Sequence, residues 1–303
     1  MRTKNTNLHT AARPPSPTPH CRERFTARRF PWIGRALTAL VVLNLAACAA
    51  NQPGPGGPQP SDPSEVLTDA AIVRAGVDLG AAALREKNYA DAMRWFHLAA
   101  EQGDPVAQNS IGTLYHNGFG VARDYGQAMR WYRKAADQGN PLAQGNIGLL
   151  YFQGLGVPVD YGQAMIWFRR AADQGNSEAE NGIGFLYHKG LGVSQDYAEA
   201  MRWYRKAADQ GNAFAQGNIG ALYDKGLGVP QDDVQAMSWY RQGADQGEAV
   251  AQYDIGVFYE RGRGVPRDYG EAMRWYRKAA DQGNAPAKAS LAALSAAQGV
   301  GHP

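Results

Sequence analysis

Cysteine is almost missing from this sequence of 303 residues, which contains only Cys21 and Cys48. Both lie before residue 50, so the remaining five sixths of the chain hold no thiol. A disulfide framework of the kind that stabilises many small exported domains is therefore excluded for the bulk of the chain.

Long apolar runs are scarce as well. One run, LTALVVLNLAACAA at residues 37–50, is too short to span a bilayer as a helix. The residues before it carry eight Lys or Arg and one acidic residue, Glu23. A basic segment followed by a short apolar run is typical of a secretory signal peptide, which we predict at residues 1–47.

The end of this apolar run, from Leu45 to Cys48, resembles a bacterial lipobox, whose cysteine is acylated and becomes the new N terminus. The resemblance implies a lipid anchor at Cys48. Because Ala49 rather than Asp follows the cysteine, it also implies the periplasmic side of the outer membrane. An ordinary cleavage after Ala49, which would release a soluble periplasmic or secreted protein, stays open. The Pro/Gly-rich residues 48–69 are expected to form a flexible linker.

An excess of basic charge disappears with the leader. The whole chain has a formal net charge of +3, but removal of residues 1–47 leaves 23 basic residues against 27 acidic ones, a net charge of −4. A mildly acidic protein has no electrostatic attraction to nucleic acid, so we expect no nucleic-acid partner.

Recognisable catalytic motifs are also missing. The sequence has no GxSxG, no HExxH, no P-loop and no Cys/His set that could form a triad. Its recurring GxGV stretches, as at residues 118–121, follow no strand, so we interpret them as loops between helices. We therefore expect a protein that is not an enzyme and that binds no cofactor and no metal.

What the sequence has in abundance is a repeat of 36 residues. Residues 124–140 read DYGQAMRWYRKAADQGN and residues 268–284 read DYGEAMRWYRKAADQGN. Six tryptophans follow the same spacing: Trp95, Trp131, Trp167, Trp203, Trp239 and Trp275. A fixed period of this length is typical of a solenoid, in which each unit buries its apolar face against its neighbours.

Each unit predicts a helical hairpin. In the unit at residues 140–174, Asn140 and Pro141 are suited to the start of one helix, and Gly154 ends it. Asp160 starts a second helix, which stops at Gly175. The same starting Asp recurs as Asp124, Asp196, Asp232 and Asp268. We interpret the Trp and Met positions of the second helix as core, and expect Trp203→Ala to cost about 3–5 kcal/mol.

The phrases ALYDKGLGVPQD and AMSWYRQGADQGEAVAQYDIG resemble the Sel1-like repeat, a relative of the tetratricopeptide repeat. The resemblance covers residues 72–296 and implies an all-α fold, a right-handed α/α solenoid. Within residues 70–298 we expect one hairpin closer to a plain tetratricopeptide unit, about five Sel1 repeats and a capping helix. Residues 299–303 are expected to be a disordered tail.

Positions that vary between repeats are not needed for stacking, so a partner could be recognised there. By analogy with tetratricopeptide geometry, we assign the variable positions of each first helix to a concave face. The candidates are Asn109, Thr113, His116, Leu149, Phe152, Asn181, Phe185, His188, Asp224, Tyr253, Val257 and Glu260. The face changes from neutral and aromatic to acidic along the chain. His116 and His188 lie two repeats apart and are not expected to form a ligand cluster.

Three functions remain open at this stage. The leading hypothesis is a monomeric, lipid-anchored scaffold in the bacterial cell envelope that binds a protein or peptide on the concave face. An alternative is a module for envelope polysaccharide or peptidoglycan, with exposed Phe152, Phe185 and Tyr253 as stacking platforms. A weaker alternative is a cell-wall or β-lactam hydrolase, which the resemblance suggests through cysteine-rich relatives.

Overall fold

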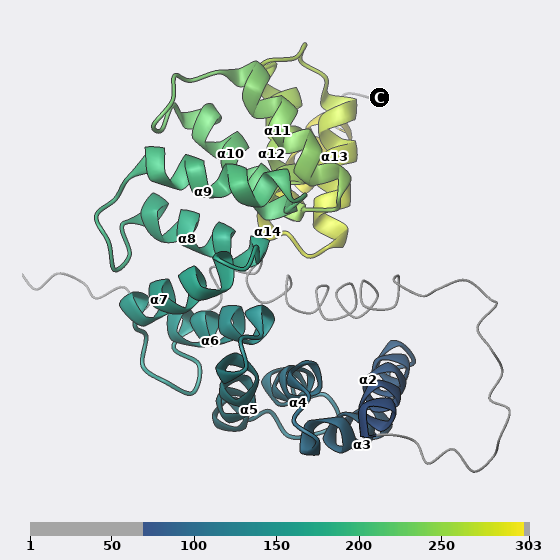
Figure 1. Cartoon of the computed structure of the whole chain (residues 1–303). Helices are drawn as coiled ribbons and strands as arrows, with labels where there is room; N and C mark the ends of the chain where they lie inside the picture. The colour runs from purple at the N-terminus through teal and green to yellow at the C-terminus, as the bar shows by residue number, and fades with distance from the viewer. Residues whose placement is uncertain (1–68, 300–303) are drawn as a thin grey trace, which may run out of the picture. The chain divides into compact units, whose positions relative to one another are not determined.

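The computed structural model describes residues 69–299, and within this range it contains thirteen α-helices and no strand. Figure 1 shows these helices following one another as a series of hairpins. Their bounds are α2 Asp69–Arg85, α3 Tyr89–Glu101, α4 Pro105–Asn117, α5 Tyr125–Asp137, α6 Pro141–Gln153, α7 Tyr161–Ala172, α8 Ser177–Lys189, α9 Tyr197–Asp209, α10 Ala213–Lys225, α11 Asp233–Asp245, α12 Ala249–Arg261, α13 Tyr269–Asp281 and α14 Ala285–Gly299.

The helices pair in chain order. Helices α2 and α3 form hairpin 1, α4 and α5 form hairpin 2, and the series continues to α12 and α13, which form hairpin 6. Each second helix also packs against the first helix of the next hairpin, and α14 covers α13 at the end of the series. The prediction of an all-α solenoid of stacked hairpins is confirmed.

Several predictions concern residues outside the described range. The signal peptide, Cys48 and the linker up to residue 68 belong to this group, as does the tail from residue 300 onward. Among residues 69–299, none of the helices combines the length and the apolar character that a bilayer-spanning segment requires.

Local capping explains why the helices start and stop where they do. The side chain of Asn140 accepts a hydrogen bond from the backbone N–H of Ala143, and Pro141 occupies the first turn of α6. The helix ends at Gly154, whose φ of 70° is left-handed. The side chain of Asp160 caps α7 in the same way, as predicted.

A glycine in each first helix makes room for an aromatic ring of the second helix. A Cβ atom on Gly148 of α6 would lie 2.6 Å from the ring of Phe168 on α7. The ring therefore packs directly on the helix backbone, which brings the two helices of a hairpin close together. The other five pairs are Gly80 with Phe96, Gly112 with Tyr132, Gly184 with Tyr204, Gly220 with Tyr240 and Gly256 with Tyr276.

The tryptophans hold a different position from the one predicted. The aromatic residue after each tryptophan is the buried one: Tyr204 is fully buried, whereas Trp203 is half-buried. Trp203 on α9 packs against the apolar cluster formed by α7 and α8, and Lys206 lies 4.5 Å above its ring. The prediction that the tryptophan is a core residue is met only in part, because its indole is half-buried and lies over the seam between two hairpins.

The glycine loops also hold neighbouring hairpins together. Gly156, in the loop between α6 and α7, has a φ of 70°, and a Cβ atom there would lie 2.7 Å from the Cβ of Tyr125 in the preceding hairpin. The loop thus packs against the start of the preceding second helix, which agrees with its interpretation as a connection between helices.

A row of glutamine side chains adds polar contacts to this apolar packing. Gln138, at the end of α5, donates one hydrogen bond to the Gln108 side chain of α4 and another to the carbonyl of Gly103 in the loop between α3 and α4, both at 2.8 Å. Equivalent bonds join Gln174 to Gln144, Gln210 to Glu180, Gln246 to Gln216 and Gln282 to Gln252. These bonds satisfy buried polar groups beside the helix ends.

Candidate functional site

The candidate site is the face formed by the first helices, α4, α6, α8, α10 and α12. First helices of neighbouring hairpins contact each other, as α6 does with α8 and α10 with α12. Side chains on the flanks of these helices therefore contact both their own hairpin and the neighbouring one, whereas side chains on the outward side are accessible to solvent.

The twelve predicted face residues divide into two groups. Five are buried: Asn109, Thr113, Asn181, Phe185 and His188. Seven are half-buried: His116, Leu149, Phe152, Asp224, Tyr253, Val257 and Glu260. The description of Phe185 as an exposed platform is wrong, because only 5% of its surface is accessible. A partner that docks without rearrangement meets the half-buried group.

Hydrogen bonds between first helices explain why two of the predicted face residues, both asparagines, are buried. Asn146 Nδ2 of α6 donates a hydrogen bond of 3.0 Å to Asn109 Oδ1 of α4. Asn218 Nδ2 of α10 donates an equivalent bond of 2.9 Å to Asn181 Oδ1 of α8. Asn109 and Asn181 thus join first helices across two of the junctions instead of facing a partner.

An aromatic group occupies the face of hairpins 3 and 4. The ring of Phe152 lies 5.7 Å from that of Phe185 and 5.6 Å from that of Tyr161, in both cases edge to face. The ring of Phe185 lies 6.4 Å from that of His188, and the ring of His188 lies 5.7 Å from that of Tyr197. These rings pack on one another across the junction of α6 and α8, which leaves the half-buried Phe152 as the accessible member of the pair with Phe185.

The two histidines are held neutral. Burial lowers the pKa of His116 to about 4, with a further contribution from Arg123, and burial does the same for His188, with contributions from Lys189 and Lys225. Nδ1 of His188 lies 3.4 Å from the hydroxyl of Tyr204. Among residues 69–299, no group of three or more His, Cys, Asp or Glu side chains is placed to hold a metal ion.

In each hairpin, the polarity of one first-helix residue matches the type of buried aromatic residue that the second helix places beneath it. Where the second helix provides a tyrosine, the residue above it is polar; where it provides a phenylalanine, that residue is apolar. Tyr240 donates a 3.4 Å hydrogen bond to Asp224, and Tyr276 donates one to Glu260. The six pairs are Leu84 with Phe96, His116 with Tyr132, Phe152 with Phe168, His188 with Tyr204, Asp224 with Tyr240 and Glu260 with Tyr276.

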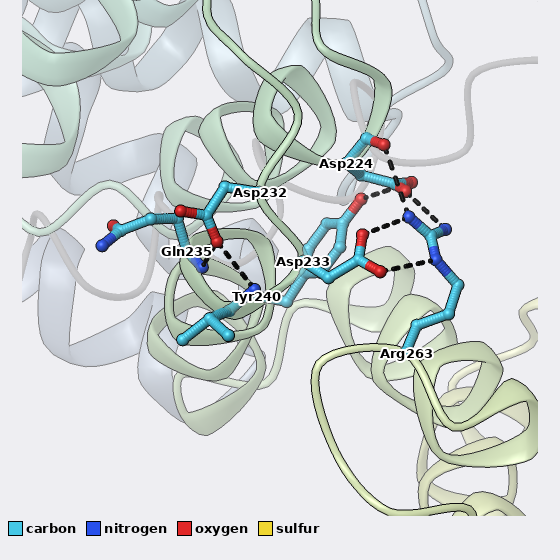
Figure 2. A network of polar contacts seen from close by, with 7 residues as sticks. Asp224, Asp232, Asp233, Gln235, Tyr240 and Arg263 are labelled. Atoms are coloured by element: carbon cyan, nitrogen blue, oxygen red, sulfur yellow. Dashed lines mark hydrogen bonds and ion pairs between the residues drawn. The ribbon is translucent and has the colours of Figure 1, made fainter.

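Hairpins 5 and 6 carry an ion-pair network that the sequence reasoning missed. Arg263 Nη1 lies 2.6 Å from Asp224 Oδ1, its Nε donates to Asp233 Oδ2 at 3.2 Å, and its Nη2 also pairs with Asp233. Figure 2 shows the Arg263 guanidinium between these two carboxylates, with the Tyr240 hydroxyl beside Asp224. Asp232, on the other side of the picture, caps α11 by accepting from the backbone of residues 234 and 235.

This network replaces an apolar contact of the other hairpins. The positions of Arg263 and Asp233 correspond to those of Phe119 and Tyr89, whose rings stack at 4.8 Å between hairpins 1 and 2. The sequence contains a signal for the exchange, since Asp233 interrupts the repeated tyrosine and Arg263 interrupts a row of Phe and Leu at the same repeat position. Neither substitution alone predicts an ion pair, but the two together predict a charged junction between hairpins 5 and 6.

These features define an α-solenoid with a uniform core and a variable first-helix face. The family model of the Sel1 repeat matches six consecutive segments, residues 71–104, 105–140, 141–176, 177–212, 213–248 and 249–284. The chain therefore belongs to the Sel1 repeat family. Proteins of this family generally mediate protein–protein interactions, and the scaffold is typically non-catalytic. No curated protein matches this chain.

Solved structures agree with this assignment. The chain is 37% identical to a Sel1 repeat protein from Oxalobacter formigenes, with a TM-score of 0.64 over 73% of this chain and 86% of that one. It is also 37% identical to a protective antigen present in uropathogenic Escherichia coli strains, which displays an SLR fold, with a TM-score of 0.58 over 75% of this chain. The match spans 48% of that antigen, about half its length. Immunity protein PA5088 from Pseudomonas aeruginosa, at 21% identity and a TM-score of 0.51, shares the fold.

Proposed function

We propose that this chain is a non-catalytic scaffold, anchored in the bacterial cell envelope through Cys48, that binds a protein or peptide partner on its first-helix face. The observation that carries the proposal is the division between constant and variable positions. The glycine–aromatic pairs recur in all six hairpins, whereas the half-buried positions of the first helices differ from hairpin to hairpin. A surface whose residues vary over a constant core is suited to recognising one particular partner.

Photocrosslinking in intact cells tests the protein-partner proposal. A photoreactive phenylalanine analogue replaces Phe152 or Tyr253, which are half-buried on the first-helix face, and in a matched control replaces Arg130 or Arg202, which are exposed on second helices. We expect a discrete crosslinked protein from the first pair and none from the second pair. Equal crosslinking from both pairs would show that the face has no special role.

Glycan binding is the second candidate, because Phe152 and Tyr253 present accessible aromatic surface. It is weakened by the burial of Phe185, which removes one of the three expected platforms. Co-sedimentation with purified peptidoglycan separates the two functions. If the Phe152→Ser/Tyr253→Ser variant loses peptidoglycan binding while its crosslinked protein partners stay the same, the scaffold proposal is wrong and the glycan function stands.

The anchor is tested separately. Cells expressing the wild-type chain or Cys48→Ser are labelled with a palmitate analogue, and we expect label only in the wild type. The expected lipid at Cys48 also predicts that the wild type sediments with outer membranes and that Cys48→Ser does not. Equal labelling of both chains would exclude acylation at this cysteine and favour a soluble periplasmic or secreted protein.

A further inference from the structure

The junction between α10 and α12 lacks the polar contact found at two of the other junctions. At the α4–α6 and α8–α10 junctions, an asparagine of the later helix donates to an asparagine of the earlier one. The corresponding residues at α10–α12 are Gly217 and Asp254, which occupy the repeat positions of Asn181 and Asn218. Gly217 has no side chain, and a carboxylate at position 254 has no N–H to donate.

Asp254 is therefore a half-buried carboxyl group without a hydrogen-bond donor or ion-pair partner among residues 69–299. At the equivalent position of α10, a Cβ atom on Gly217 would meet only Glu248 Oε2 at 3.3 Å and Ala251 Cβ at 3.8 Å. The structure thus combines an acceptor that lacks a donor with a position where the neighbouring helix contributes no side chain.

The surrounding charges make this carboxyl group electrostatically unfavourable as an anion. Burial, together with the nearby carboxylates of Glu248 and Asp224, raises the pKa of Asp254 to about 8, while Lys225 acts in the opposite direction. Tyr240 of α11 also lies close enough to interact with Asp254. The guanidinium of Arg263 is already paired with Asp224 and Asp233. A cation that enters the junction would therefore relieve an existing repulsion.

We propose that the junction of α10 and α12 binds a lysine or arginine side chain of the protein partner, with Asp254 as its carboxylate partner beside Gly217. The proposal rests on the scaffold function above and names the chemistry of the partner. Charge complementarity supports it, because the carboxyl groups of Asp224, Glu248 and Asp254 stand against the ammonium group of Lys225 at the junction. The aromatic group of hairpins 3 and 4 precedes the junction on the same first-helix row, so the bound segment carries an apolar residue at one end and a basic residue at the other.

Peptide selection tests this inference without knowledge of the natural partner. The full chain is immobilised and a phage library of random twelve-residue peptides is selected on it at pH 7.5 in low salt. We expect the selected peptides to be enriched in Lys or Arg near one end. The same selection on Asp254→Asn should lose that enrichment. This variant restores the residue type found at positions 146 and 218, so we expect it to fold.

A matched control removes one negative charge elsewhere. Asp281 is exposed at the end of α13, and Asp281→Asn should select the same basic peptides as the wild type. A synthetic peptide from the wild-type selection should bind Asp254→Asn about tenfold more weakly or worse, and should bind Asp281→Asn unchanged. Carboxyl-carbon NMR titration of the wild type should show a lower pKa of Asp254 in the peptide complex than in the free protein.

The outcomes separate this inference from the function on which it rests. Peptides that bind the wild type without basic enrichment, or that bind Asp254→Asn equally well, would overturn the lysine or arginine site and leave the peptide-binding scaffold in place. A wild-type selection with no binding above that of an uncoated surface would count against both. Basic enrichment that is lost in Asp254→Asn and kept in Asp281→Asn supports both.

Discussion

At the scale of single residues, each hairpin depends on one contact between a glycine and an aromatic ring. Gly148→Ala places a methyl group 2.6 Å from the Phe168 ring, so we expect a loss of about 1–3 kcal/mol in unfolding free energy. Gly145→Ala on the same helix meets nothing closer than 3.7 Å. This control should be neutral or stabilise by up to about 1 kcal/mol. Urea unfolding measures both, and equal effects would contradict the packing argument.

The pairing of buried aromatic residues with face residues makes a second prediction. Phe168→Tyr adds a hydroxyl beneath Phe152, where no acceptor corresponds to Asp224 or Glu260. Burying an unsatisfied hydroxyl should cost about 1–3 kcal/mol. The double variant Phe152→Asp/Phe168→Tyr recreates the pair found in hairpin 5, so the two changes together should cost less than their sum. Additive losses in urea unfolding would show that the pairing is coincidental.

Asp254 should also affect the dependence of stability on pH. Its pKa is raised from 3.8 to about 8 in the folded chain. Between these values the folded state binds a proton that the unfolded state does not, so this group makes stability fall as pH rises from about 4 to about 8. Thermal melting of wild type and Asp254→Asn across this range should show a difference that grows with pH in favour of the variant. A difference independent of pH would exclude the raised pKa.

The residues also show where sequence reasoning succeeds and where it stops. Caps such as Asp160 and Gly154 act within a few residues, so the helix ends could be predicted from local chemistry. The burial of Asn181 and Phe185 could not, because it depends on how closely the next first helix approaches. The charged junction at Arg263 was missed for a similar reason, since its partners Asp224 and Asp233 lie 39 and 30 residues earlier.

At the scale of helices, the paired aromatic residues of the second helix have separate tasks. Tyr204 fills the interior of its own hairpin against Gly184, whereas Trp203 covers the seam with the preceding hairpin. Tyr204→Ala should therefore cost about 3–5 kcal/mol. Trp203→Ala should cost less, because part of its indole already meets solvent. Urea unfolding of the two variants decides the order, and a larger loss for Trp203→Ala would show that the tryptophan contributes more to the core than the tyrosine beside it.

The packing of each second helix against its neighbouring hairpin also explains which side chains are exposed at the two ends of the series. Trp95 on α3 has no preceding second helix within the described range and is 37% exposed, the greatest exposure among the six repeat tryptophans. At the other end, Leu291 and Leu294 of α14 pack against the α13 cluster, while its opposite side is lined by exposed alanines. A solvent-facing helix with small outward residues is what the end of a solenoid requires.

At the scale of the whole molecule, hairpins 2 to 5 alternate at one position of the repeat of 36 residues. Asn109 and Asn181 occur in hairpins 2 and 4, and they receive bonds from hairpins 3 and 5. Hairpins 3 and 5 have Gly145 and Gly217 at that position. Because the units are equivalent in backbone and unequal at their junctions, a hairpin cannot be removed without changing which residues meet.

Deletion of hairpin 3, residues 141–176, tests this alternation. The deletion places Asn109 opposite Gly182 and leaves its buried amide without a partner. Asn109→Ala should therefore destabilise the full chain by about 1 kcal/mol through the lost bond, yet stabilise the deletion variant by about 1–3 kcal/mol through removal of an unsatisfied group. Urea unfolding of the four chains measures both effects. If Asn109→Ala changes both backgrounds in the same direction, the junctions are interchangeable and the solenoid is a simple repetition of one unit.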